Sequence, residues 1–222
     1  MKALVENLLG ENPLAALRAV LPQVPPDGIG RDEFALYPEM RKPGQAAPIA
    51  ASVLLPVIAR PSGEGGPTIL FTRRTEHLAR HSGQISFPGG RSEASDLSPV
   101  ETALRETMEE TGIAPAFVSI AGFLPRYRTG TGFDILPVVG LVAPGFALRP
   151  DAREVAEIFE VPLAFFLDPA NLRDGSRDMA GRTRRFHVFE PGGHYIWGIT
   201  AALLVDFAAW LRAAHDMKTH EN

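Results

Sequence analysis

Apolar residues along this chain follow two patterns, compact runs typical of strands and the i, i+3, i+4 spacing typical of amphipathic helices. The strand-like runs are residues 51–58, 68–72, 117–124, 135–142 and 184–189. A turn from Gly63 to Pro67 joins the first two runs into a predicted hairpin. Helical spacing is found in residues 99–111, 152–159, 162–167 and 197–214. Strands and helices mixed in this order predict an α/β fold, an α/β/α sandwich with a mixed sheet.

The N-terminal part of the chain has a different character. Residues 4–21 have leucine and alanine at helical spacing around Asn12-Pro13, which predicts one or two short helices. Residues 22–48 contain so many prolines and glycines that no regular element is expected there. We therefore expect residues 1–48 to form a helical segment followed by a surface arm or linker, and residues 49–222 to form the main domain. A contact of the arm with a second copy of the chain, giving a homodimer, stays open.

Composition narrows the classes of protein. The chain has 222 residues, 45% of them hydrophobic and 22% charged, as expected for one globular domain with a substantial core. Cysteine is absent, which excludes disulfides, thiolate metal sites and cysteine nucleophiles. A net charge of −4 gives no global field for nucleic acid or an anionic membrane surface. Neither a run of about 18 uninterrupted apolar residues nor a signal-peptide pattern is found, so a soluble cytoplasmic protein is expected.

Three glutamates stand out within the helix predicted at 99–111. Glu106, Glu109 and Glu110 fall within an arc of about 100° on an ideal helix. Such like charges repel each other by a few tenths of a kcal/mol per pair, and Arg105, which can reach Glu109 at i+4, cannot neutralise all three. A solvated acidic face is one interpretation. The other is a site for Mg²⁺ or Mn²⁺, because hard divalent ions prefer oxygen ligands.

The flanking residues favour the second interpretation. Gly89 and Gly90 follow Ser86-Phe87-Pro88, which is typical of a strand that breaks into a tight turn. Glycines at such a turn let the backbone approach an ion or a phosphate closely. Pro99 suits the first turn of the helix, and Gly112 suits its C-terminal stop.

Together these residues resemble the Nudix box. Five residues separate Gly90 from the acid Asp96, and the segment from Arg105 to Ile113 matches the Arg-Glu-x-x-Glu-Glu-x-Gly part of that box. Eight residues, rather than the usual seven, separate Asp96 from Arg105, and this expansion is similar to the coenzyme A pyrophosphatase branch of the family.

Residues outside the box extend the resemblance to this branch. The leader from Leu70 to Gly90, ending in Phe-Pro-Gly-Gly, is similar to that of the branch, with departures at Phe71, Thr75 and Ala79. Trp-Gly-Ile-Thr-Ala at 197–201 resembles another of its motifs. Trp197 is interpreted either as a pocket residue or as a packed aromatic at the start of the last helix, and Phe207 and Trp210 are expected in the core.

The resemblance implies a Nudix fold and a set of catalytic residues. Glu106, Glu109 and Glu110 are expected to hold Mg²⁺ or Mn²⁺, with a carbonyl of Gly89 or Gly90 as a further ligand. Arg105 is expected to orient Glu109. A later glutamate usually acts as ligand or general base, and Glu154 is the first candidate and Glu157 the second. Asp96 is interpreted mainly as a structural acid near the helix.

The resemblance also implies a substrate. Coenzyme A carries a pyrophosphate and a ribose 3′-phosphate, and the cations expected to bind these groups are Arg73, Arg74, Arg80 and His81. A less favoured alternative makes His77 and His81 metal ligands. The expected reaction splits coenzyme A or its thioesters into 4′-phosphopantetheine derivatives and adenosine 3′,5′-bisphosphate. The alternatives are a Nudix pyrophosphatase for ADP-ribose, dinucleotides or nucleoside triphosphates, and a nucleotide-sensing Nudix module without turnover.

Overall fold

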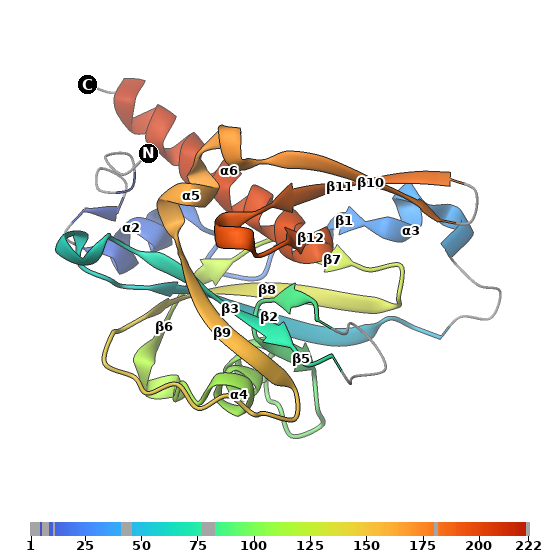
Figure 1. Ribbon diagram of the computed structural model, residues 1–222, viewed down its shortest axis with the longest axis horizontal. Coiled ribbons are helices and arrows are strands. Elements are labelled where there is room, and N and C mark those ends of the chain that lie inside the picture. Colours follow the sequence, from blue (N-terminus) through green and yellow to red (C-terminus); the bar gives the residue numbers. More distant parts are fainter. Residues whose placement is uncertain are drawn as a thin grey trace.

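A computed structural model describes residues 5, 9–10, 12–40, 46–76, 83–179 and 182–220 (Figure 1). The strands of the main sheet are β1 (Ile29–Asp32), β2 (Ile49–Ile58), β3 (Thr68–Arg74), β4 (Ile85–Ser86), β5 (Gly89–Arg91), β6 (Val118–Phe123), β7 (Arg126–Arg128), β8 (Phe133–Val142) and β9 (Val155–Pro162). A smaller sheet contains β10 (Arg173–Met179), β11 (Arg182–Phe189) and β12 (Ile196–Trp197). The described residues also form the α-helices α2 (Pro13–Val20), α3 (Glu33–Leu36), α4 (Pro99–Thr111), α5 (Leu163–Leu167) and α6 (Gly198–His220).

The main sheet is mixed and is built around β2 and β8. These two strands run parallel in register from Ile49 opposite Phe133 to Ile58 opposite Val142. The strand order is β1-β7-β8-β2-β3-β4, while β5 pairs with β2, β6 with β8 and β9 with β3. The mixed sheet predicted from the sequence is thereby confirmed.

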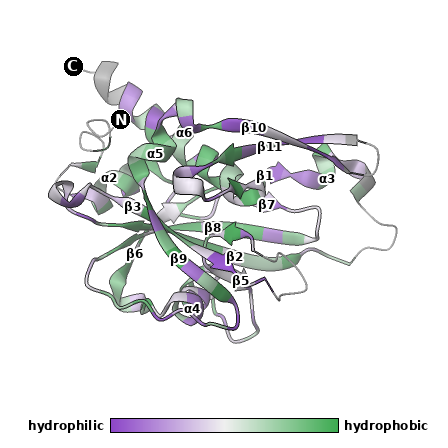
Figure 2. Ribbon diagram, viewed as in Figure 1, coloured by the Kyte–Doolittle hydropathy of each residue, from purple (hydrophilic) through white to green (hydrophobic). Residues whose placement is uncertain are grey.

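Helices cover both faces of this sheet. Along β2, Leu54 belongs to the apolar cluster shared with α4, whereas Leu55 and Val57 belong to the large cluster shared with α2, α5 and α6. Successive side chains of a strand point to opposite faces, so one strand supplies both cores. Figure 2 shows hydrophobic residues concentrated along the central strands and the inner helices. The predicted α/β/α sandwich is confirmed.

Two predictions about elements and side chains are wrong. Residues 152–159, predicted as a helix, form a turn followed by β9, which pairs antiparallel with β3. Trp210, predicted in the core, is 38% exposed on α6, while Phe207 is buried as predicted. None of the helices in the described part of the chain combines the length and apolarity needed to cross a membrane.

The proline- and glycine-rich segment is more ordered than a surface arm or linker. Residues 29–32 form β1, which pairs parallel with β7. Before it, Arg18 donates to the carbonyl of Ile120 through Nε at 3.0 Å, and Phe123 N donates to Pro22 O at 3.0 Å. Gln23 Nε2 also donates to Ala121 O at 2.9 Å. The segment therefore contacts β6 and extends the main sheet.

Candidate active site

Helix α4 carries the acidic residues and has well-defined ends. The Ser98 side chain caps its N-terminus by accepting a hydrogen bond from Glu101 N at 3.2 Å, and Pro99 follows as the first helical residue. At the other end Gly112 adopts φ +80°, the left-handed conformation that favours glycine, and its N–H donates to Met108 O. The helix boundaries predicted from the sequence are confirmed.

Glu110 points from α4 into the sheet. Its carboxyl group accepts a hydrogen bond from Thr72 Oγ1 of β3 at 3.3 Å and lies 3.8 Å from Arg74 Nη1. Only 7% of its side chain is exposed, and burial raises the pKa of Glu110 to about 8. A buried carboxyl with a raised pKa is typical of a functional site.

Glu106 lies against β5, one turn earlier on the same helix. A Cβ added at Gly90 would lie 2.6 Å from Glu106 Oε2, so only glycine leaves room for this carboxylate. Burial raises the pKa of Glu106, and Arg105 partly offsets the rise. The two glycines were predicted in a tight turn, but Gly89 and Gly90 lie in strand β5 and pair with Val53 and Ser52 of β2. The close approach expected at Gly90 is therefore to a side chain of α4.

Arg105 connects the acidic residues. Its Nη1 lies 3.0 Å from Glu106 Oε1 and 3.1 Å from Glu109 Oε2, which is the contact expected at i+4. Its Nη2 donates to Arg91 O at 3.0 Å. Glu109 is 58% exposed, so it meets solvent at the outer side of the helix. Arg105 thus orients Glu106 as well as Glu109.

Asp96 fixes Arg105 from the opposite side. Arg105 Nε and Nη2 donate to the two Asp96 oxygens at 2.9 and 3.0 Å, a bidentate geometry. Thr102 Oγ1 and Glu93 N also donate to Asp96, both at 2.9 Å. The Arg105 guanidinium lowers the pKa of Asp96 below its ordinary value. The interpretation of Asp96 as a structural acid is consistent with these bonds.

Glu154, the first candidate for the later glutamate, approaches from the loop before β9. Its Oε2 lies 3.2 Å from Arg74 Nη2, and the same guanidinium lies near Glu110. The negative charge of Glu154 contributes to the raised pKa of both Glu106 and Glu110. Glu154 therefore belongs to the acidic cluster formed with Glu106, Glu109 and Glu110.

The adjacent arginines of β3 point to different faces of the sheet. Arg74 contacts the acidic cluster on the α4 side, whereas Arg73 Nε lies 3.0 Å from Glu157 Oε2 on the other side. Glu157, the alternative general base, is thus separated from Glu154 by the sheet. Arg80 and His81, and also His77, lie outside the described residues.

The donor set of the acidic cluster fits a divalent cation. It offers oxygen atoms only, and its two inner carboxyl groups, those of the half-buried Glu106 and the buried Glu110, have raised pKa values that a nearby positive ion would lower. Within the described ranges, however, no three His, Cys, Asp or Glu side chains are close enough together to hold a metal ion. Arg105 and Arg74 pair with the carboxylates in this conformation, so the expected convergence of the three glutamates requires their side chains to rotate.

Comparison with known proteins identifies the family. The sequence model of the NUDIX domain matches residues 49–179. The chain belongs to the Nudix family. A relative described as an uncharacterized Nudix hydrolase, NudL, from Pectobacterium atrosepticum is 37% identical, covering 83% of this chain and 96% of the relative. The NudL of Yersinia enterocolitica is 38% identical, covering 69% of this chain and 77% of the relative.

Solved structures include the Nudix hydrolase RenU from M. smegmatis, with a TM-score of 0.48, 17% identity, and coverage of 79% of this chain and 89% of that chain. The match of the NUDIX domain to residues 49–179 and the likeness to NudL show that the chain is a Nudix hydrolase with the Nudix fold. Enzymes of this family hydrolyse pyrophosphate bonds in small nucleotide substrates and use divalent ions such as Mg²⁺ or Mn²⁺.

Sequence reasoning missed two features of this Nudix site. Thr72 was not singled out, although it alternates with Arg74 along β3 and so faces the same side as Glu110. His194 was also missed; its Nε2 lies 3.3 Å from Glu157 Oε1, and no motif in the sequence marks it. Strand alternation could have found Thr72, but the position of His194 depends on packing between distant segments.

Proposed function

We propose that this Nudix hydrolase cleaves the pyrophosphate bond of coenzyme A or acyl-coenzyme A, releasing 4′-phosphopantetheine or its acyl derivative and adenosine 3′,5′-bisphosphate. The observation that carries the substrate assignment is the leader from Leu70 to Gly90, which resembles that of the coenzyme A pyrophosphatase branch. Strand β3 supports this assignment, because two residues of the leader bring guanidinium groups to its two faces: Arg74 lies beside the acidic cluster, and Arg73 lies beside Glu157 on the other face.

The residues of the chain have separate tasks in this proposal. Glu106, Glu109 and Glu110 would hold the cation, and Arg105 and Asp96 keep the first two in place. A divalent ion there supplies charge neutralisation and activation of water for attack on phosphorus. Glu154 accepts a proton from the attacking water while the bond from phosphorus to the bridging oxygen breaks. Arg74 exchanges its carboxylate partners for a phosphate oxygen of the substrate.

Product analysis tests the substrate directly. Purified protein is incubated with coenzyme A and Mg²⁺, and the products are identified by mass spectrometry; we expect 4′-phosphopantetheine and adenosine 3′,5′-bisphosphate. ADP-ribose and NADH are compared at equal concentration. A higher kcat/KM for either of them would contradict the coenzyme A assignment. Dephospho-coenzyme A, which lacks the 3′-phosphate, is expected to have a raised KM.

The alternative of a sensing module without turnover is tested at Glu110. We expect Glu110→Gln to lower kcat by about 10²-fold or more, because it removes a charge from the cluster that serves the transition state. Glu64→Gln is the matched control, since Glu64 is exposed in a one-turn helix between β2 and β3. Nucleotide binding by the wild-type protein without hydrolysis of any of the three substrates would support the sensing module instead.

A further inference from the structure

Four rings stack on the face of the main sheet opposite α4. Phe87 and Phe71 have centroids 5.3 Å apart, Phe71 and Phe159 5.5 Å, and Phe159 and His194 3.8 Å. The interplanar angles are 23°, 23° and 16°, so the rings are nearly parallel. Phe71 and Phe87 are buried, whereas the His194 side chain is 28% exposed. His194 is therefore the solvent end of this ring stack.

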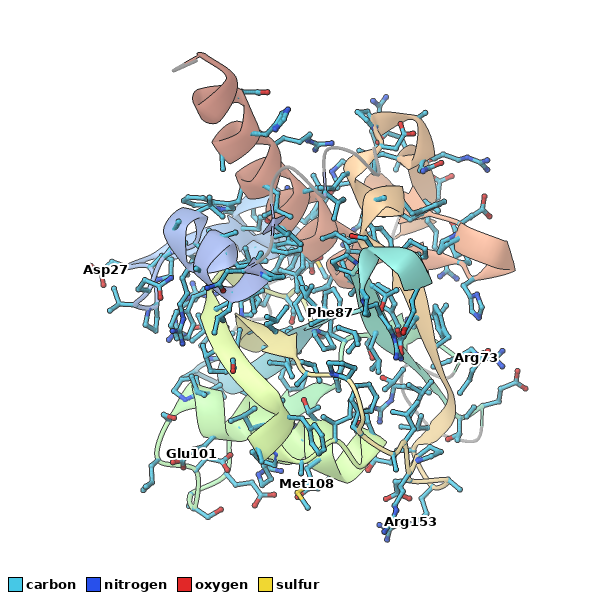
Figure 3. All side chains as sticks on the ribbon, turned by 90° about the vertical axis from the view of Figure 1, so that its left-hand side faces the viewer. Asp27, Arg73, Phe87, Glu101, Met108 and Arg153 are labelled. Atoms are coloured by element: carbon cyan, nitrogen blue, oxygen red, sulfur yellow. The ribbon has the colours of Figure 1, made fainter. Side chains whose placement is uncertain are left out.

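The Glu157 carboxylate contacts both His194 and Arg73. One carboxylate oxygen lies 3.3 Å from His194 Nε2, and the other lies 3.0 Å from Arg73 Nε. The Arg73 side chain is 46% exposed, and neither its Nη1 nor its Nη2 donates a hydrogen bond to another described residue. Figure 3 shows Arg73 at the outer edge of the molecule and Phe87 in its interior. A fixed aromatic surface thus lies beside a guanidinium with unused donors.

The two residues before His194 have no side chains that could cover its imidazole. Gly192 and Gly193 precede His194 and are exposed, and a Cβ added at Gly193 would meet no atom within 4 Å. A Cβ at Gly192 would come no nearer to the ring than 3.9 Å, at Nδ1. The exposed Tyr195 follows directly. Phe159 covers one face of the imidazole, and the exposed part of the His194 side chain is available to a second flat ring.

We propose that His194 and Arg73 form a subsite for the base and a phosphate of a purine nucleotide, with Glu157 as the positioning residue for both. The base stacks on the imidazole, as bases do on aromatic side chains including histidine. The guanidinium of Arg73 binds a phosphate through Nη1 and Nη2. Arg73 adjoins Arg74 along β3, and Arg74 contacts the acidic cluster on the opposite face of the sheet, so a bound nucleotide would reach both around the end of β3. This inference rests on the proposed function, whose substrate carries adenine and a ribose phosphate.

Binding without turnover tests this subsite. Adenosine 3′,5′-bisphosphate is titrated into the full chain by calorimetry without added metal. We expect His194→Ala to weaken binding about tenfold to a hundredfold, because that is the effect of removing one aromatic stacking partner. His194→Phe keeps a flat ring and is expected to restore most of the affinity. Arg73→Gln is expected to weaken binding of the bisphosphate while leaving binding of adenosine unchanged.

His187→Ala is the matched control, because His187 is 31% exposed and also faces a carboxylate, that of Asp174. Its affinity is expected to equal that of the wild-type protein. No binding by the wild-type protein, or unchanged affinity in a folded His194→Ala protein, would overturn the subsite. The assay contains no coenzyme A, so it decides the subsite even if the wild-type protein cleaves a different nucleotide and the proposed function fails.

Discussion

The three glutamates of α4 share one helical face but have different surroundings. Glu110 is buried against Thr72, Glu106 lies against Gly90, and Glu109 is largely exposed beside Arg105. Burial raises the pKa of the first two carboxyl groups, since the charged form loses contact with water. The two inner glutamates therefore have the most to gain from a cation, whereas Glu109 acts at the solvent side.

Gly90→Ala tests the close approach of β5 to Glu106. The new Cβ would displace the carboxylate, which lies at the end of a flexible side chain, so we expect kcat to fall at least about tenfold with little change in Tm. Gly63→Ala is the control, because a Cβ there meets no atom within 4 Å. Steady-state kinetics and thermal unfolding of both variants provide the measurement. Wild-type kcat in Gly90→Ala would show that the position of Glu106 is unimportant.

Glu154 and Glu157 provide a second test at this scale. We expect Glu154→Gln to lower kcat by about 10²-fold, because a general base typically contributes about 10²–10⁴-fold. Glu157→Gln is expected to raise KM and leave kcat nearly unchanged, since Glu157 contacts Arg73 and His194 on the other face of the sheet. Kinetics over a range of substrate concentrations separate the two effects. A large fall in kcat in Glu157→Gln but not in Glu154→Gln would identify Glu157, rather than Glu154, as the general base.

Sequence spacing predicts some of these contacts and misses others. The ion pair of Arg105 with Glu109 follows from helix geometry alone. The bidentate pair of Arg105 with Asp96 joins residues on different elements, so its geometry needs the fold. Arg73 and Arg74 were given one task, although neighbouring residues of a strand face opposite sides. Because Arg73 and Arg74 are consecutive and directly follow the strand-like run 68–72, the sequence already implied that their side chains lie on opposite faces of the sheet.

At the scale of elements, periodicity succeeds where a segment buries one continuous face. Strands β2, β3 and β8 and helices α4 and α6 were predicted because their apolar residues pack against the sheet. It fails at β9, where Val155, Ile158 and Phe159 also match helical spacing. Residues 155–162 form a strand because they pair with β3, and Glu157 and Glu160 form ion pairs with Arg73 and Arg60 on opposite faces of the sheet. That information lies outside the segment.

Strand β1 is the second element that periodicity misses, whereas α2 agrees with the short helix expected in residues 4–21; Gly122 of β6 tests the role of this N-terminal segment. A Cβ there would lie 2.6 Å from Leu21 Cβ and 2.8 Å from Pro22 O, so Gly122→Ala is expected to push this segment away from the sheet. We expect a loss of about 1–3 kcal/mol in the free energy of unfolding, as for overpacking of a core. Hydrogen exchange is expected to accelerate within residues 13–32.

Gly145→Ala is the control for this substitution. Gly145 has φ +98°, so alanine there adds backbone strain, but its Cβ meets open space. Chemical denaturation and hydrogen exchange of both variants provide the measurement. Equal losses, without faster exchange in residues 13–32, would show that the contact between this segment and β6 contributes little.

For the whole molecule, the main sheet separates two kinds of chemistry. The acidic cluster lies on the α4 side, and the ring stack ending at His194 lies on the other, with β3 contributing residues to both. The net charge of −4 does not reveal this arrangement, because it is a sum over the chain. A substrate with a pyrophosphate and a purine ring would contact both sides around the end of β3, where Arg73 and Arg74 lie opposite the start of β9.

Metal binding is therefore expected to appear as a change in the stability of the whole fold. Burial raises the pKa of Glu106 and of Glu110, and a bound cation would stabilise their charged forms, so Mg²⁺ or Mn²⁺ is expected to bind the folded state in preference to the unfolded one. At about 100 times the dissociation constant a ligand adds about 2.7 kcal/mol, which raises the Tm of a chain of this size by about 5–10 °C. Thermal unfolding with and without each ion measures the shift. Glu106→Gln combined with Glu110→Gln is expected to abolish it, whereas Glu64→Gln keeps it; an undiminished shift in the double variant would place the metal elsewhere.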